Sequence, residues 1–134
     1  MKRIYAATPF RMERLINNIC DFIESQGHFP IHPFLALPLE RYNYERYPKE
    51  EIYQVCFDLV GITDELWIFG IGTGALTEYR KAKELKKPVK SYIKVFDSDW
   101  EERFKEKEFE RYQKNFGEIL DEVIETSIIP TRDC

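Results

Sequence analysis

The sequence predicts a doubly wound α/β domain, with a mostly parallel sheet of about five strands, helices on both faces and a long C-terminal helix. Two observations support this prediction. Short apolar runs alternate with amphipathic stretches of ten or more residues, which is the length that right-handed crossovers between parallel strands require. The chain of 134 residues also fits one domain with a substantial core. We therefore treat residues 1–134 as a single domain.

The composition is typical of a soluble protein. Hydrophobic residues make up 43% of the chain and aromatic residues 15%, but no apolar run approaches the roughly 20 residues of a membrane span. The opening stretch from Met1 to Tyr5 has the pattern of a strand and not of a secretion signal. We therefore expect a cytoplasmic location and no membrane partner.

Charge and cysteine content exclude several classes of site. The 24 acidic and 20 basic residues are well mixed and give a net charge of −4, which argues against nucleic acid as a partner. Cys20, Cys56 and Cys134 are widely spaced, so neither a disulfide framework nor a zinc site is predicted. Cys20 and Cys56 fall on apolar helix faces, where cysteine usually serves as a small hydrophobic residue.

The first half of the chain contains two expected strands and one long helix. Arg3 to Ala7 is an apolar run that predicts a buried strand, and His28 to Ile31 is a second strand. Between them, a helix from about Phe10 to Gln26 is indicated by apolar residues at spacings of three and four, with Gly27 at its C-cap. Pro33 to Tyr47 is rich in proline and aperiodic, which predicts a long loop.

The middle of the chain repeats the alternation. A helix is expected to begin near Pro48, and Leu66 to Phe69 forms a third strand that ends in a glycine-rich turn. A third helix begins near Ala75, and Val89 to Phe96 is predicted to be a fourth strand.

The C-terminal part contains a charged segment. Asp97-Ser98-Asp99 offers an N-cap to a long helix, and Ile128-Ile129 is a candidate for a short terminal strand. The apolar side of that helix holds Trp100, Phe104, Tyr112, Phe116, Leu120 and Val123. It is expected to cover the sheet or a subunit interface.

A doubly wound sheet places a ligand crevice at the carboxyl ends of its strands. In doubly wound sheets of the Rossmann-like and flavodoxin-like kinds, ligands bind where the winding reverses, which for the flavodoxin-like order lies between the first and third strands. The two loops there are Ala7 to Phe10 and Gly70 to Gly74. The expected contacts with a ligand are Thr8, Pro9, Phe10, Gly70, Gly72, Thr73 and Gly74. A glycine turn without a ligand is the alternative interpretation.

Three side chains near this crevice can carry chemistry. Glu78 lies about one turn into the helix after the glycines, where the helix dipole stabilises a carboxylate. Asp58 lies near the end of the preceding helix, off its apolar stripe, and Tyr5 lies in the first strand. Each also has a structural interpretation: a helix-start acid, a solvated acid and a core ring. His28 and His32 bracket the second strand, where hydrogen bonding alone explains them.

These segments resemble the nucleoside deoxyribosyltransferases and the related deoxynucleoside monophosphate N-hydrolases. The matching stretches read "IYAATPF", "DLVGITDELWIFG" and "GTGALTEYRKAKELKKPV", and the resemblance covers Arg3 to Val95. It departs from the family at Gly72, where the transferases carry an acid and the N-hydrolases a serine, and at Arg80, which replaces a small glycine. A more distant likeness to lysine-decarboxylase-like phosphoribohydrolases rests on "GxGT…E".

The resemblance implies cleavage of an N-glycosidic bond. Glu78 falls on the family's nucleophile, Asp58 on its partner acid, and Tyr5 on the tyrosine that orients the nucleophile. A carboxylate stabilises and captures the positive charge that develops at C1′, while a second acid protonates the leaving base. This chemistry needs no metal and no cofactor, and the expected partner is a small nucleoside or nucleotide.

A binding function without catalysis is the alternative, with Gly72 and Arg80 as marks of a remodelled site. In either case a cover for the crevice is expected. The segment from Pro33 to Tyr47 can provide it, and so can a second subunit. We therefore expect a homo-oligomer, at least a dimer.

Overall fold

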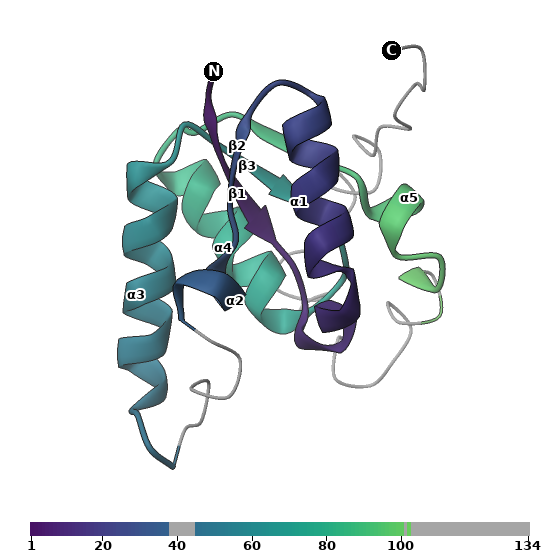
Figure 1. Cartoon of the computed structure of the whole chain (residues 1–134). Coiled ribbons are helices and arrows are strands. Elements are labelled where there is room, and N and C mark those ends of the chain that lie inside the picture. The colour runs from purple at the N-terminus through teal and green to yellow at the C-terminus, as the bar shows by residue number, and fades with distance from the viewer. Residues whose placement is uncertain (38–44, 101, 103–134) are drawn as a thin grey trace.

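A computed structural model describes residues 1–37, 45–100 and 102 of the chain (Figure 1). Within these residues the sheet has four parallel strands, in the order β2-β1-β3-β4. The strands are β1 (Arg3–Ala7), β2 (Phe29–Ile31), β3 (Glu65–Ile68) and β4 (Val89–Ser91). The described part of the chain thus has four strands where about five were expected. The expected strand at Ile128-Ile129 and the long C-terminal helix lie outside it.

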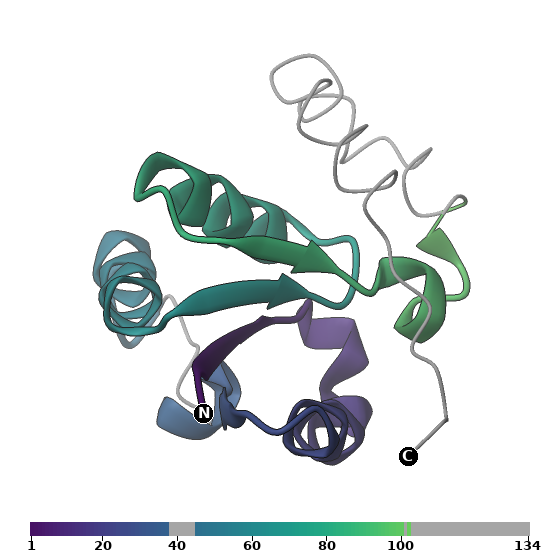
Figure 2. The ribbon, with the colours of Figure 1, turned by 90° about the horizontal axis from the view of Figure 1, so that it is seen from above.

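Helices cover both faces of this sheet, which confirms the α/β class. Figure 2 shows α1 (Ile16–Ser25) on one side, and α3 (Lys49–Ile62) and α4 (Thr73–Glu84) on the other. Because α1 links β1 to β2 and α3 links β2 to β3, the winding reverses between β1 and β3.

The alternation of side chains along β1 and β3 creates two separate cores. Successive residues of a strand point to opposite faces, so each strand supplies both cores. The core under α4 and α3 contains Tyr5, Ala7, Leu66, Ile68, Leu76, Tyr79 and Val60, among others. The core under α1 contains Ile4, Ala6, Trp67, Phe69, Ile19 and Ile23, together with Tyr92.

The helix expected from Phe10 to Gln26 is divided into two pieces. A 3-10 helix, η1, spans Phe10–Leu15 and has a kink at Met12, whose backbone is not helical. Met12 is buried, and its backbone N–H bonds to the carbonyl oxygen of Pro9 at 3.0 Å, which turns the chain tightly after β1. The regular helix α1 then ends as expected, with Gly27 at a positive φ of 85°.

Two further segments differ from the sequence-based expectations. The segment after His32 begins with a short helix, α2 (Pro33–Ala36), which the His32 side chain caps and in which proline takes an early position. The strand expected from Val89 to Phe96 stops at Ser91, and α5 (Ile93–Phe96) follows. β4 ends there because its neighbour β3 ends at Ile68, which is the partner of Ser91.

Candidate active site

A cavity of about 310 Å³ lies at the carboxyl ends of β1 and β3, where the winding reverses. Its walls come from the loop after β1, the glycine loop after β3, the start of α4, one face of α3 and one residue of α2. The lining residues are Thr8, Pro9, Phe10, Arg11, Phe34, Ile52, Tyr53, Cys56, Ile71, Gly72, Thr73, Gly74, Ala75 and Glu78. Of the expected ligand contacts, all but Gly70 line this cavity.

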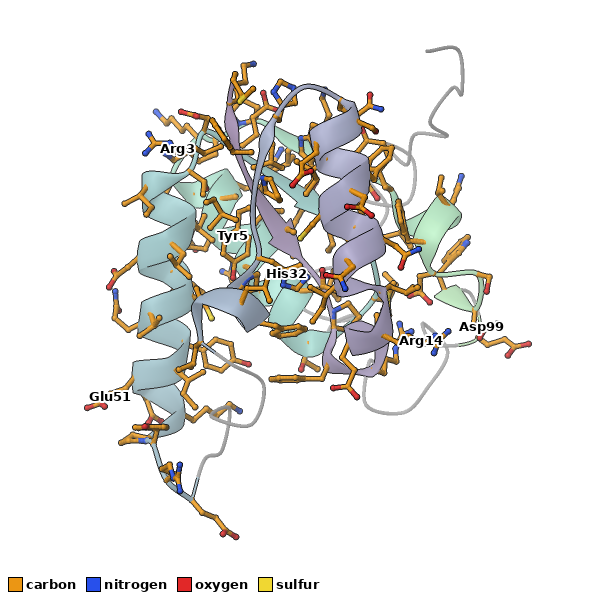
Figure 3. The ribbon with its side chains drawn as sticks, in the orientation of Figure 1. Arg3, Tyr5, Arg14, His32, Glu51 and Asp99 are labelled. Atoms are coloured by element: carbon orange, nitrogen blue, oxygen red, sulfur yellow. The ribbon has the colours of Figure 1, made fainter. Side chains whose placement is uncertain are left out.

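Glu78 and Tyr5 meet at the inner end of the cavity. The Tyr5 hydroxyl donates a hydrogen bond to Oε2 of Glu78, across 73 positions of sequence. The Tyr5 ring is fully buried in the core under α4, so this residue fills the core and also reaches the site. In Figure 3 Tyr5 lies in the interior of the molecule, whereas Arg3, Glu51 and Asp99 lie at its periphery.

A thiol is the second partner of Glu78. Cys56 on α3 donates a hydrogen bond to the Glu78 carboxylate and also lines the cavity. The apolar stripe of α3 predicts Cys56 as a small core residue. That stripe does face inward, but at Cys56 it borders the cavity.

The environment of Glu78 raises its pKa to about 7. Burial is the largest cause, since it disfavours the charged carboxylate, while the hydrogen bonds from Tyr5 and Cys56 lower the pKa and offset part of the effect. Because α4 begins at Thr73, Glu78 lies in the second turn, beyond the first turn where the helix dipole acts most strongly. Burial thus opposes the stabilisation of the carboxylate that was expected from the position of Glu78 near the start of the helix.

Asp58 is not brought into the cavity. It is exposed on α3 and accepts a hydrogen bond from Nε2 of Gln54 at 2.8 Å. Residues two positions apart on a helix differ by about 200° in direction, so Asp58 points away from the face that Cys56 presents to the cavity. The expected convergence of Tyr5, Asp58 and Glu78 therefore holds for Tyr5 and Glu78 but not for Asp58.

The glycine loop packs against the loop after β1. A Cβ atom at Gly72 would lie 2.6 Å from Cβ of Pro9, and one at Gly70 would lie 2.3 Å from the sulfur of Met12. These two glycines therefore allow the two loops to approach each other closely. Gly74 differs, because a Cβ there would meet no atom within 4 Å. It leaves the cavity open beside the start of α4.

An ion pair that the sequence does not reveal joins η1, the glycine loop and the end of α5. Nη1 and Nη2 of Arg11 bond to the two carboxylate oxygens of Asp97, at 3.0 and 2.6 Å, and Nη2 also bonds to the carbonyl oxygen of Ile71 at 2.7 Å. The backbone N–H of Ile71 donates to Asp97 at 2.9 Å. Asp97 is 3% exposed. This buried network fixes the glycine loop, and 86 positions separate its two charged residues.

Aromatic rings form one wall of the cavity. Phe10 and Phe34 stack with their centroids 4.9 Å apart and their planes 12° apart, and Phe10 is 46% exposed. Tyr53 contributes a third ring to the lining. Phe34 thus brings the start of the segment from Pro33 to Tyr47 to the cavity. Tyr42 and Tyr44, other aromatic residues of that segment, lie outside the described residues.

The remaining candidates near this edge have structural partners. The Thr8 hydroxyl donates to the carbonyl oxygen of Ala6 at 3.2 Å, and Arg80 is exposed and pairs with Glu84 at 3.6 Å. Nδ1 of His32 accepts from the Phe34 backbone N–H at 3.2 Å. Burial lowers the pKa of His32 to about 4, so the ring is neutral at pH 7.

Comparisons with known proteins identify no family for this chain. No protein-family model matches it, and no curated protein shows significant similarity. Among the residues that the structure describes, no helix combines the length and apolar character needed to cross a membrane.

Proposed function

We propose that the cavity binds a nucleoside or nucleotide and that Glu78 cleaves its N-glycosidic bond, by hydrolysis or by base exchange. The observation that carries this proposal is the hydrogen bond from Tyr5 to a buried Glu78 that lines the cavity. A buried carboxyl group with a raised pKa at a cavity wall is typical of functional sites.

In this mechanism Glu78 acts as the nucleophile. The carboxylate stabilises the positive charge that develops at C1′ of the sugar and then forms a covalent bond to that carbon. Tyr5 and Cys56 orient the carboxylate through their hydrogen bonds. Since burial raises the pKa of Glu78 to about 7, the reactive carboxylate forms close to neutral pH.

The network of Arg11, Asp97 and Ile71 supports catalysis indirectly. It fixes the loop between β3 and α4, and thereby the start of the helix that carries Glu78. A nucleophile must be held within a fraction of an ångström of its productive position. We therefore assign Arg11 and Asp97 a positioning role.

A binding function without catalysis remains a second candidate. It is favoured by the position of Asp58, which lies outside the cavity and leaves the expected two-acid mechanism incomplete. One feature expected of a remodelled binder is missing, because Arg80 lies outside the lining and pairs with Glu84.

The experiment that separates these candidates is a measurement of free base. The protein is incubated with a panel of ribo- and deoxyribonucleosides and their monophosphates, and released base is quantified by chromatography. Glu78→Gln should abolish release while ligand binding, measured by calorimetry, persists. Release at an unchanged rate by Glu78→Gln would remove Glu78 from the mechanism. Binding without release by the natural protein would favour the binder.

We also propose that the chain forms a homo-oligomer. The outer face of α3 exposes Val55 (44%) and Ile62 (58%), which are large apolar side chains for a solvated surface. Multi-angle light scattering at micromolar concentration should show a dimer or a larger species, and Val55→Glu should weaken it. A monomer over the whole concentration range would refute this proposal.

A further inference from the structure

The cavity offers one carboxylate among its described lining residues, and this is Glu78. Cleavage of an ordinary nucleoside by a retaining mechanism uses a general acid beside the nucleophile. The base leaves with both bonding electrons, and a general acid protonates it as it leaves. Tyr5 and Cys56 direct their protons to Glu78. The guanidinium of Arg11 does not release its protons in proteins, and the phenol of Tyr53, which also lines the cavity, is a much weaker acid than a carboxyl group and is poorly matched to protonate a base at neutral pH.

The electrostatics of the cavity favour a cation. The charge of Arg11 is neutralised by its two hydrogen bonds to Asp97, at 3.0 and 2.6 Å. No basic side chain is among the causes that shift the pKa of Glu78. Among the residues that the structure describes, none therefore compensates the negative charge of the ionised Glu78, and a positively charged ligand would do so.

We propose that this site acts on N-glycosides whose leaving base carries a positive charge at the ring nitrogen bonded to the sugar or elsewhere in the ring. Pyridinium nucleosides and N7-alkylated purine nucleosides are the two chemical classes that fit. This inference rests on the proposed function and deepens it.

The step balances without a general acid. The bond between C1′ and the ring nitrogen breaks, both electrons pass to the cationic ring, and the base leaves neutral. A carboxylate oxygen of Glu78 bonds to C1′ in the same step. Water then attacks C1′, the ester bond to Glu78 breaks to restore the carboxylate, and one proton is released to solvent.

The aromatic wall supports the same substrate class. Phe10 stacks on Phe34 at 4.9 Å and is 46% exposed, and Tyr53 adds a third ring. The faces of aromatic rings attract cations, and flat heteroaromatic cations also stack on them. A cationic base bound here would lie beside Glu78, the one carboxylate among the described lining residues.

The test compares cationic and neutral substrates that share a sugar. N7-methylguanosine and nicotinamide riboside are the cationic probes, guanosine and inosine are the neutral ones, and the deoxyribosides of each base are included. Free base is measured by chromatography, and the rate with Glu78→Gln is subtracted as background. Asp58→Asn is the matched control, because it removes an acid that lies outside the cavity.

A general acid contributes roughly 10²–10⁴-fold to such reactions. We therefore expect kcat/KM to be about 100-fold or more higher for the cationic probes, with Asp58→Asn unchanged. For nicotinamide riboside, whose pyridinium ring carries no dissociable ring proton, kcat/KM should rise as the pH passes through about 7, where the Glu78 carboxyl ionises, and then stay level. The groups that contact Glu78 are Tyr5 and Cys56, and both donate hydrogen bonds to its carboxylate.

Several results would overturn this inference. Equal kcat/KM for guanosine and N7-methylguanosine, with both activities lost in Glu78→Gln, would reject the cationic substrate class and leave the N-glycosidase proposal standing. A decline of kcat/KM for nicotinamide riboside at alkaline pH, or a loss of activity in Asp58→Asn, would reveal a general acid and reject it as well. Release of no base from any probe would reject both proposals.

Discussion

Replacement of Glu78 by glutamine should raise the stability of the protein relative to the natural protein as the pH increases, whatever its function. Glu78 is 6% exposed, and its pKa rises from 4.5 to about 7 on folding. A raised pKa in the folded state means that the unfolded chain binds fewer protons between these two values. The contribution of Glu78 to the free energy of unfolding is therefore fully present below about pH 4.5. It is lost as the pH rises through about 7.

The size of this effect follows from the shift. One pKa unit corresponds to about 1.4 kcal/mol, so a shift from 4.5 to about 7 corresponds to about 3 kcal/mol. Glutamine fills nearly the same volume, accepts a hydrogen bond from Tyr5 and does not ionise. The difference in unfolding free energy between Glu78→Gln and the natural protein should thus grow by about 3 kcal/mol from pH 4 to pH 8.

Unfolding in urea, monitored by tryptophan fluorescence at both pH values, measures this difference. The contributions of groups that titrate in both proteins cancel. Glu84→Gln is the control, since Glu84 is about half exposed on the same helix and surface changes usually stay within about 0.5 kcal/mol. A difference between Glu78→Gln and the natural protein that does not change with pH would refute the assignment of Glu78 as a buried group that ionises at a cost.

Three further predictions concern the packing around the site. His32→Asn keeps a side-chain cap for α2 but removes a buried imidazole whose pKa burial lowers to about 4. Because this imidazole binds a proton more readily in the unfolded chain, the variant should lose up to about 3 kcal/mol less stability between pH 7 and pH 4, as measured by urea unfolding. Gly72→Ala should destabilise the protein by about 1–3 kcal/mol because its Cβ would clash with the facing loop, whereas Gly74→Ala should be neutral or stabilising by up to about 1 kcal/mol; equal thermal shifts would contradict this. Arg11→Ala should cost about 3 kcal/mol by leaving a buried carboxylate unpaired, and Asp97→Ala should cost less in that background than alone; additive effects in a double-mutant cycle would contradict the coupling.

Periodicity in the sequence predicted the architecture well, because it is a local property of the chain. The apolar run from Arg3 to Ala7 became β1 without change, and the glycine turn after β3 forms one side of the cavity. The strand expected from Val89 to Phe96 was wrong in its second half. Its end depends on where the neighbouring strand β3 stops, at Ile68, and no local pattern contains that information.

The site was predicted only in part for the same reason. A core ring was one interpretation of Tyr5, and its ring does pack in the core. The hydroxyl at the end of the same side chain reaches Glu78. Helical periodicity placed Asp58 off the apolar stripe of α3, and the residues of that stripe, such as Cys56, face inward, so Asp58, two positions later, points away from the cavity. The pair of Arg11 and Asp97 depends on tertiary structure across 86 positions.

Mass spectrometry of a trapped intermediate tests the role of Glu78 most directly. A 2′-fluoro N-glycoside with a good leaving base slows hydrolysis of the glycosyl–enzyme bond, because fluorine disfavours positive charge at C1′. We predict that the intact protein gains the mass of the fluorinated sugar and that peptide mapping locates this gain on Glu78. Release of base with no gain of mass, or with the sugar attached to another residue, would contradict the assignment of Glu78 as the nucleophile.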